Sequence, residues 1–195
     1  MFLPDLERDC WQWLTAAPDQ KEDGFKTFTL ATVRPNGEAD ARTVVLRRVD
    51  EAARVVWFHT DRRAEKVAQL QANPRATLLF WDEHRQVQLR LTAETTLHTD
   101  DAETDEQWGT LWVGGRKTYL SELTPGSEQA EPYPGFPPAL GENLPSEADS
   151  EAGRANFMAV ACRVRSVEYL KLSRAGQTRA RFTYGDEKRS TWLAP

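Results

Sequence analysis

Short runs of β-prone residues follow one another through most of this chain, and turns rather than regular helices join them. These runs cover residues 25–48, 54–60, 76–81, 86–96, 157–172, 178–184 and 189–193. The first range contains Pro35-Asn36-Gly37, a turn signal that predicts a hairpin. Without regular helical crossovers, this order favours a mainly β fold, an antiparallel Greek-key barrel, over a doubly wound sheet.

Helical patterns occupy the gaps between these strands. Apolar residues at helical spacing predict a capping helix over 3–17. Asp61 is placed to cap a second helix over 62–72, and 100–123 reads as one or two helices broken at Gly114-Gly115. Residues 124–155 hold six prolines and are expected to form a long, partly ordered loop. A length of 195 residues then fits a single domain over 1–195.

The charge of the chain argues for a small anionic ligand. A net charge of −5 and a pI near 5.3 disfavour nucleic-acid binding, which needs a dominant basic surface. Basic residues nevertheless gather at 42–48 and again at 62–66. A local basic cluster on an acidic chain is a better match to a small anion than to a polyanion.

Localisation is expected to be cytoplasmic. No apolar run approaches the roughly 20 residues that span a bilayer, and the first residues lack the pattern of a signal peptide. Cys10 and Cys162 are expected to be reduced and buried. The three histidines are dispersed and no CxxC occurs, so no metal site is expected.

Three segments concentrate the residues that carry chemistry. In 42–47, strand alternation puts Arg42, Val44 and Leu46 on one face, and Thr43, Val45 and Arg47 on the other. Residues 58–66 run from a strand end into a helix start, where free N–H groups suit a phosphate. Thr60, Arg63 and Lys66 add a hydroxyl, a guanidinium fork and a point charge. Arg85-Gln86-Val87 opens a strand with an amide that can read a planar heterocycle.

Taken singly, each segment has an ordinary explanation. Arg42 and Arg47 fit solvated strand positions, and 62–66 fits the charged outer face of a helix. Gln86 alone fits a surface position. The combination of the three in this order is what favours a binding site.

The order and spacing resemble the pyridoxamine 5′-phosphate oxidase family of FMN-binding split barrels. Four stretches carry the resemblance: LATVRPNGEADARTVVLRR, WFHTDRRAEKVAQLQANPRATLLFW, RQVQLRLTAE and the C-terminal RARFTY…TWLAP. The resemblance implies a homodimer with FMN at its interface. It implies that Arg42, Thr60 and Lys66 hold the FMN phosphate, that His59 and Gln86 lie along the flavin, and that Arg181 is nearby. With Arg63 from the helix start, the expected cofactor set is Arg42, Thr43, Val44, Val45, Leu46, Arg47, His59, Thr60, Arg63, Lys66, Gln86 and Arg181.

The substrate half of the family pattern is altered. Arg47 stands where the family has a lysine, Gln177-Thr178-Arg179 replaces an Arg-x-His pair, and Leu172 replaces a tryptophan. On the helix before the loop, Arg116, Lys117, Tyr119 and Ser121 are possible substitutes for the family's phosphate clamp, although a solvated helix face explains them equally well. The expected substrate-binding set is Arg47, Arg116, Lys117, Tyr119 and Arg179, for a small phosphorylated or heterocyclic compound.

Three functions remain open from the sequence. The first is an FMN-dependent oxidoreductase with pyridoxamine or pyridoxine 5′-phosphate oxidase activity as the default. The second is an FMN enzyme of the same fold that acts on another compound. The third is a flavin- or haem-binding module without turnover.

Overall fold

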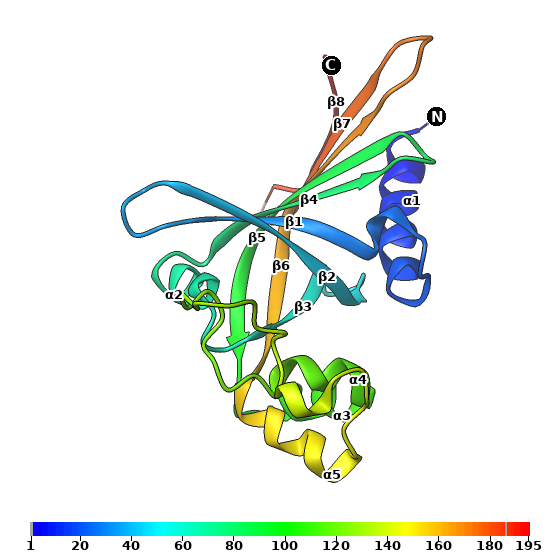
Figure 1. Ribbon diagram of the computed structural model, residues 1–195. Helices are drawn as coiled ribbons and strands as arrows, with labels where there is room; N and C mark the ends of the chain where they lie inside the picture. The colour runs from blue at the N-terminus through cyan, green and yellow to red at the C-terminus, as the bar shows by residue number, and fades with distance from the viewer. Residues whose placement is uncertain (1, 186) are drawn as a thin grey trace.

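Eight strands form one antiparallel sheet in the computed structural model, which describes residues 2–185 and 187–195 (Figure 1). The strands are β1 (Thr27–Val33), β2 (Ala39–Asp50), β3 (Val55–Asp61), β4 (Arg75–Asp82), β5 (Val87–His98), β6 (Phe157–Lys171), β7 (Thr178–Thr183) and β8 (Arg189–Leu193). Their order across the sheet is β3-β2-β1-β4-β5-β6-β7-β8. The placement of β4 beside β1 makes the first four strands a Greek key.

A further pairing between β3 and β6 closes six of these strands into a barrel. It runs antiparallel over seven residue pairs, from Val55 opposite Arg163 to Asp61 opposite Phe157. Strands β7 and β8 continue outward from β6 and stand clear of the barrel (Figure 1). The predicted fold, a mainly β split barrel, is confirmed.

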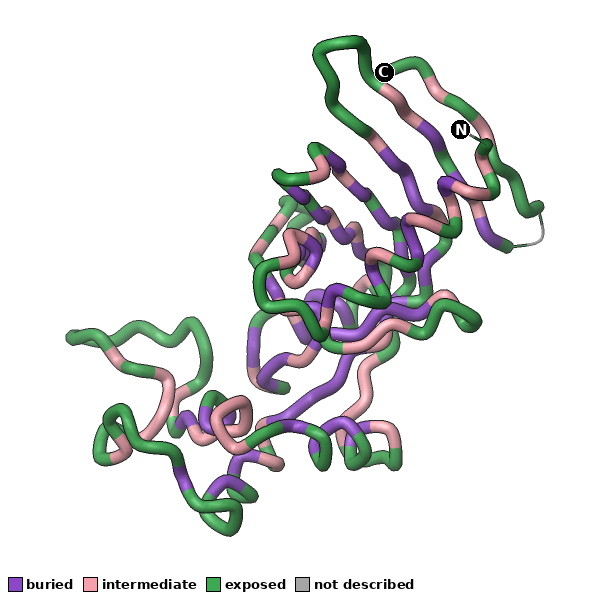
Figure 2. Tube along the Cα trace, turned by 90° about the vertical axis from the view of Figure 1, so that its right-hand side faces the viewer, coloured by how far each residue is buried: buried purple, intermediate pink, exposed green. Residues whose placement is uncertain are grey.

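Alternation along the strands fills the barrel. Phe28, Leu30, Leu46 and Phe58 point inward and are almost completely buried, whereas Thr27 on the same strand as Phe28 is exposed. Figure 2 shows this alternation of buried and exposed residues along the strands. The aromatic rings of Phe28 and Phe80 lie 4.7 Å apart between centroids. The interior is therefore a packed core and not a channel.

Helix α1 (Leu3–Ala16) adds its apolar face to this core. Leu6, Cys10, Trp11 and Leu14 are buried there, and Trp11 Nε1 donates to the Tyr184 hydroxyl at 2.9 Å. Cys10 and Cys162 are both free thiols, and burial raises the pKa of each. Among the described residues, no helix has the length and apolar character needed to cross a membrane.

Helices on the outer face of the barrel form a second, smaller core. Helix α3 (Ala102–Thr110) and a 3₁₀ turn (Lys117–Tyr119) pack against β3 and β6, and the short helix α4 (Val113–Arg116) lies between them in the chain. Trp108 and Tyr119 contact Phe157 there, with ring centroids 5.2 and 5.1 Å away. Residues 124–155 form the expected loop, with short helical turns at Pro138–Leu140, α5 (Glu147–Ser150) and Glu151–Asn156.

Two details of the predicted helices are wrong. The break between α3 and α4 falls at Leu111-Trp112, and Gly114-Gly115 lie inside α4. Helix α2 (Glu65–Ala72) begins three residues later than expected, with Ala64 as its N-cap and no side-chain cap. Asp61 does not cap it because its carboxylate instead accepts from the backbone and guanidinium of Arg63.

The packed barrel interior predicts that substitutions at inward and outward positions of β1 differ sharply in their effect on stability. Leu30→Ala removes a fully buried side chain and is expected to lower the free energy of unfolding by about 2–5 kcal/mol. Thr27→Ala, at an exposed position of the same strand, is expected to change it by less than about 0.5 kcal/mol. Urea unfolding of both variants measures this, and equal losses would contradict the assigned strand alternation.

Candidate functional site

The inward row of side chains becomes polar at one end of the barrel. On β1 the row runs Phe28, Leu30, Thr32, and on β2 it ends at Arg42, whose Cα pairs with that of Leu30. Arg42 Nη1 donates to the Thr32 hydroxyl at 2.5 Å and to the Leu30 carbonyl at 3.4 Å. An arginine is tolerated here because the core ends and polar partners begin.

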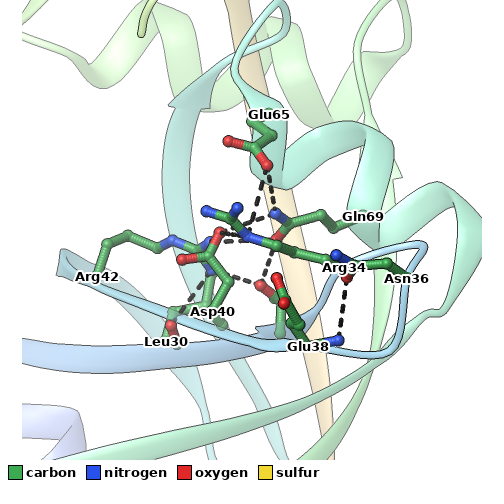
Figure 3. A network of polar contacts seen from close by, with 9 residues as sticks. Leu30, Arg34, Asn36, Glu38, Asp40, Arg42, Glu65 and Gln69 are labelled. Atoms are coloured by element: carbon green, nitrogen blue, oxygen red, sulfur yellow. Dashed lines mark hydrogen bonds and ion pairs between the residues drawn. The ribbon is translucent and has the colours of Figure 1, made fainter.

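A hydrogen-bonded network holds Arg42 in place (Figure 3). Arg42 Nη2 donates to Asp40 Oδ2 at 2.5 Å and to Gln69 Oε1 at 3.1 Å. Gln69 is buried on α2, and its amide nitrogen donates to Asp40 Oδ2 at 2.8 Å. The bond from Gln69, aided by the positive charge of Arg42, lowers the pKa of Asp40. The network thus joins the β1–β2 hairpin to α2.

Lys66 adds a second cation beside this network. Its Nζ donates to the Thr60 hydroxyl at 3.1 Å. Burial, and then repulsion from Arg42, lowers the pKa of Lys66. Among the described residues, no carboxylate forms an ion pair with Lys66, and no side chain caps α2, whose first turn contains Lys66. Two neighbouring cations and an uncapped helix start fit a phosphate group well.

Arg63 is committed to a different contact. Its guanidinium donates to both oxygens of Asp61, at 3.0 and 2.7 Å, and to the Ser121 carbonyl at 2.9 Å. The bond to Asp61 raises the pKa of Arg63. Its role toward a phosphate stays a prediction, and in the structure Arg63 links β3 to the segment before the long loop.

The 42–47 stretch alternates as predicted, with one irregularity. Val44 and Leu46 are buried and Thr43 is exposed. Between β2 and β3 the pairing passes from Leu46 opposite Phe58 to Arg48 opposite Trp57. Arg47 is therefore the extra residue of a β-bulge, a feature that re-aims side chains and is frequent beside active sites.

His59 projects from the outer face of β3 into a cavity of about 440 Å³ that Arg47 and Trp112 also line. Its Nε2 lies 2.7 Å from Gln107 Oε1, and Gln107 Nε2 donates to Glu103 at 2.9 Å. Gln107 must turn its amide nitrogen toward Glu103, so its amide oxygen faces His59. Because that oxygen can only accept a hydrogen bond, His59 carries its proton on Nε2. Burial lowers the pKa of His59 to about 4.

Two other predicted cofactor residues lie elsewhere in the fold. Gln86 lies in the turn before β5, with φ of 52°, and its amide donates to the Glu83 carbonyl at 2.8 Å. Arg181 on β7 donates to Glu168 at 3.0 Å, and Glu168 also accepts from Arg90 and Arg179. These three arginines hold the pKa of Glu168 near 2. Whether Gln86 and Arg181 reach a flavin stays a prediction.

The proposed substrate clamp on the helices has structural partners within the chain. Arg116 donates to the Leu111 carbonyl at 2.9 Å and pairs with Glu151. Lys117 is buried and donates to the carbonyls of Gly141 and Asn143 at 2.6 and 2.9 Å. Tyr119 is buried in the outer core. These contacts hold the three side chains within the chain, and their role toward a substrate stays a prediction.

Sequence reasoning missed several members of both regions. Thr32, Asp40 and Gln69 surround Arg42, and Gln107 and Trp112 line the cavity beside His59. The inward position of Thr32 in an otherwise apolar row was a usable signal. Gln69 and Trp112 gave no such signal, because their positions depend on how α2 and α3 pack on the barrel.

The barrel is closed, and its polar end carries the two neighbouring cations Arg42 and Lys66. The family model described as pyridoxamine 5′-phosphate oxidase matches residues 17–131, so the chain belongs to that family. A pyridoxine/pyridoxamine 5′-phosphate oxidase of Azorhizobium caulinodans is 34% identical over 127 residues, which cover 64% of this chain and 55% of the relative. One from Rubrobacter xylanophilus is 36% identical over 109 residues, or 55% of this chain and 48% of the relative. The chain thus spans about half the length of the curated relatives it matches.

Solved structures agree over nearly the whole chain. A pyridoxamine 5′-phosphate oxidase-related, FMN-binding protein from Nostoc punctiforme superposes with a TM-score of 0.74 and 26% identity, covering 96% of this chain and 97% of that one. PhzG from Burkholderia lata, in complex with tetrahydrophenazine-1-carboxylic acid, gives a TM-score of 0.67 at 18% identity, covering 98% and 92%. The second likeness shows the shared fold.

The burial of His59 predicts a pH dependence of stability. Its pKa of about 4 in the folded chain lies below the ordinary value of 6.5, so the unfolded chain binds this proton first as the pH falls. The stability that this pKa difference contributes is therefore fully present above pH 6.5 and is lost as the pH falls toward 4. From pH 7.5 to 5.0, His59 is expected to remove about 2 kcal/mol from the free energy of unfolding.

The measurement is urea unfolding of the wild type and of His59→Gln at both pH values. The variant, which has no titrating group at this position, is expected to lose about 2 kcal/mol less between them. The same pH dependence in both proteins would show that His59 titrates normally in the folded state.

Proposed function

We propose that this chain is an FMN-dependent oxidoreductase whose FMN phosphate binds at the polar end of the barrel. The observation that carries the proposal is the pair Arg42 and Lys66 beside the uncapped start of α2. Asp40 compensates the charge of Arg42, at 2.5 Å, but Lys66 has only the neutral Thr60 hydroxyl as a hydrogen-bond partner among the described residues. An anion seated here gains charge-assisted hydrogen bonds and restores the charge balance.

The chain's own residues hold and orient the cofactor in this proposal. Arg42 is pre-oriented by Thr32 and Gln69, so little side-chain freedom is lost when a phosphate binds. Thr60 and Lys66 supply a hydroxyl and a point charge from β3 and α2. When bound, FMN supplies the redox chemistry by accepting a hydride equivalent from the substrate. The family membership and the FMN-binding neighbour at 26% identity support this assignment.

The proposal includes a homodimer. The side chains of Thr43 and Arg47 are exposed on the outer face of β2, so a flavin lying along this strand is left open to solvent in a single chain. The outer face of β7, with Arg179 and Arg181, is also available for a second copy. A partner that covers the flavin would complete the site.

Removing either phosphate contact tests the cofactor assignment. Lys66→Ala and Arg42→Ala are each expected to weaken FMN binding by about tenfold to a hundredfold, the loss of one charged hydrogen bond. Flavin absorbance and fluorescence titrations of the purified protein measure it. Arg62→Ala is the control, because Arg62 is paired with Asp100 at 3.6 Å.

Unchanged FMN affinity in both Lys66→Ala and Arg42→Ala would contradict the phosphate site. A wild-type protein that is colourless and ignores added FMN would contradict the function itself. The first turnover to assay with the FMN-loaded protein is formation of pyridoxal 5′-phosphate, the activity that the curated relatives' name describes. Anaerobic bleaching by NADPH tests a nicotinamide donor.

A further inference from the structure

The bulge at Arg47 places an uncommitted guanidinium beside the cavity. Leu46 and Arg48 have partners on β3, whereas Arg47 lies between them without one. Among the described residues, Arg47 makes neither an ion pair nor a side-chain hydrogen bond, although it lines the 440 Å³ cavity. An arginine re-aimed by a bulge into a cavity, with its five donors free, is suited to an anionic group on a ligand.

An exposed indole faces the same cavity. Trp112 lies between α3 and α4, lines the cavity, and remains 66% exposed. Its ring lies directly against Gly114, because a methyl group built at Gly114 would overlap three carbons of the indole. Glycine at this position is therefore what allows the ring to lie here. A large, flat apolar surface that the chain itself leaves uncovered is suited to stacking on a planar ring.

The other charges of the cavity argue against a doubly charged ligand. Arg48 is already neutralised, with Glu103 at 2.5 Å and Glu106 at 3.5 Å, and its guanidinium lies 4.6 Å from the centre of the Trp57 ring. Asp19 and Glu106 also line the cavity, so its two arginines face two carboxylates. His59 adds no charge near neutral pH. Among the described residues, Arg47 is therefore the one unpaired arginine of the lining, and the carboxylate of Asp19 offsets its charge. The lining has no surplus positive charge to balance the second negative charge of a dianion.

We propose that this cavity binds a planar aromatic carboxylate, with Arg47 contacting the carboxylate and Trp112 stacking on the ring. As the assignment of a substrate, this rests on the function proposed above. Arg47 and Trp112 are then substrate contacts, and Gly114 is a positioning residue that acts through Trp112. A phosphate ester carries close to two negative charges at neutral pH and finds one unpaired cation here.

The test is isothermal titration of the FMN-loaded protein with three bicyclic probes that differ in charge: 2-naphthoate, 2-naphthyl phosphate and 2-naphthamide. We expect 2-naphthoate to bind more tightly than both others. Arg47→Ala should weaken 2-naphthoate by about tenfold to a hundredfold and leave 2-naphthamide unchanged, and Arg47→Lys should recover part of the loss. Binding of 2-naphthyl phosphate as tight as that of 2-naphthoate would overturn the proposal.

The stacking half is tested with a matched pair of glycine variants. Gly114→Ala must displace the indole, whereas a methyl group at Gly109 in α3 meets nothing within 4 Å. Gly114→Ala and Trp112→Ala should each weaken 2-naphthoate and 2-naphthamide by about threefold to tenfold, and Gly109→Ala should leave both unchanged. Wild-type affinity in Trp112→Ala, or equal effects of the two glycine variants, would overturn the stacking role.

FMN loading of every variant is measured separately by flavin absorbance. A wild-type protein that holds FMN but does not bind 2-naphthoate counts against this cavity alone. Failure of the wild type to hold FMN counts against the proposed oxidoreductase, and titration of the same probes into that protein still decides whether the cavity binds a carboxylate.

Discussion

The pairing of β3 with β6 is the interaction on which the rest of the structure depends. It joins strands about a hundred residues apart through seven antiparallel pairs and turns an open sheet into a barrel. Closure gives β3 two different faces. Val56 and Phe58 enter the barrel core, while Val55 and Trp57 become the floor on which α3 packs. His59 continues this outer row, and Thr60 ends the inner one beside Lys66. Both candidate sites thus lie at the end of one strand, on opposite faces.

The two sites differ in how their charges are arranged. At the end of the barrel, Arg42 is bonded to Thr32, Asp40 and Gln69, so its position is fixed before any ligand arrives. In the outer cavity, Arg47 has no such partners and its backbone lies in a bulge. A pre-oriented cation suits a cofactor that stays bound, because the ordering cost is met in folding. A less constrained cation suits a ligand that must leave after each turnover.

Local patterns in the sequence were sufficient to predict the barrel and the basic cluster. Alternation predicted which residues of 42–47 share a face, and the strand end followed by a helix start predicted that Thr60 and Lys66 lie together. Local patterns did not predict the contacts of a side chain that had two possible partners. Asp61 could cap α2 or pair with Arg63, and the bidentate guanidinium contact prevailed. The placing of Gln69, Gln107 and Trp112 depends on packing between elements, which periodicity does not report.

The residues that line the outer cavity are positioned by irregular backbone and not by packing in the core. Arg47 reaches the cavity through an extra residue in β2, and Trp112 lies as it does because Gly114 has no side chain. Neither feature changes the inward rows that fill the barrel or the contacts of Arg42 and Lys66. A change at either position therefore alters the cavity at small cost to the fold and to the phosphate cluster. This separation gives a physical reason why the two candidate sites can change independently: the residues around Arg42 and Lys66 are tied to the barrel, and Arg47 and Trp112 are not.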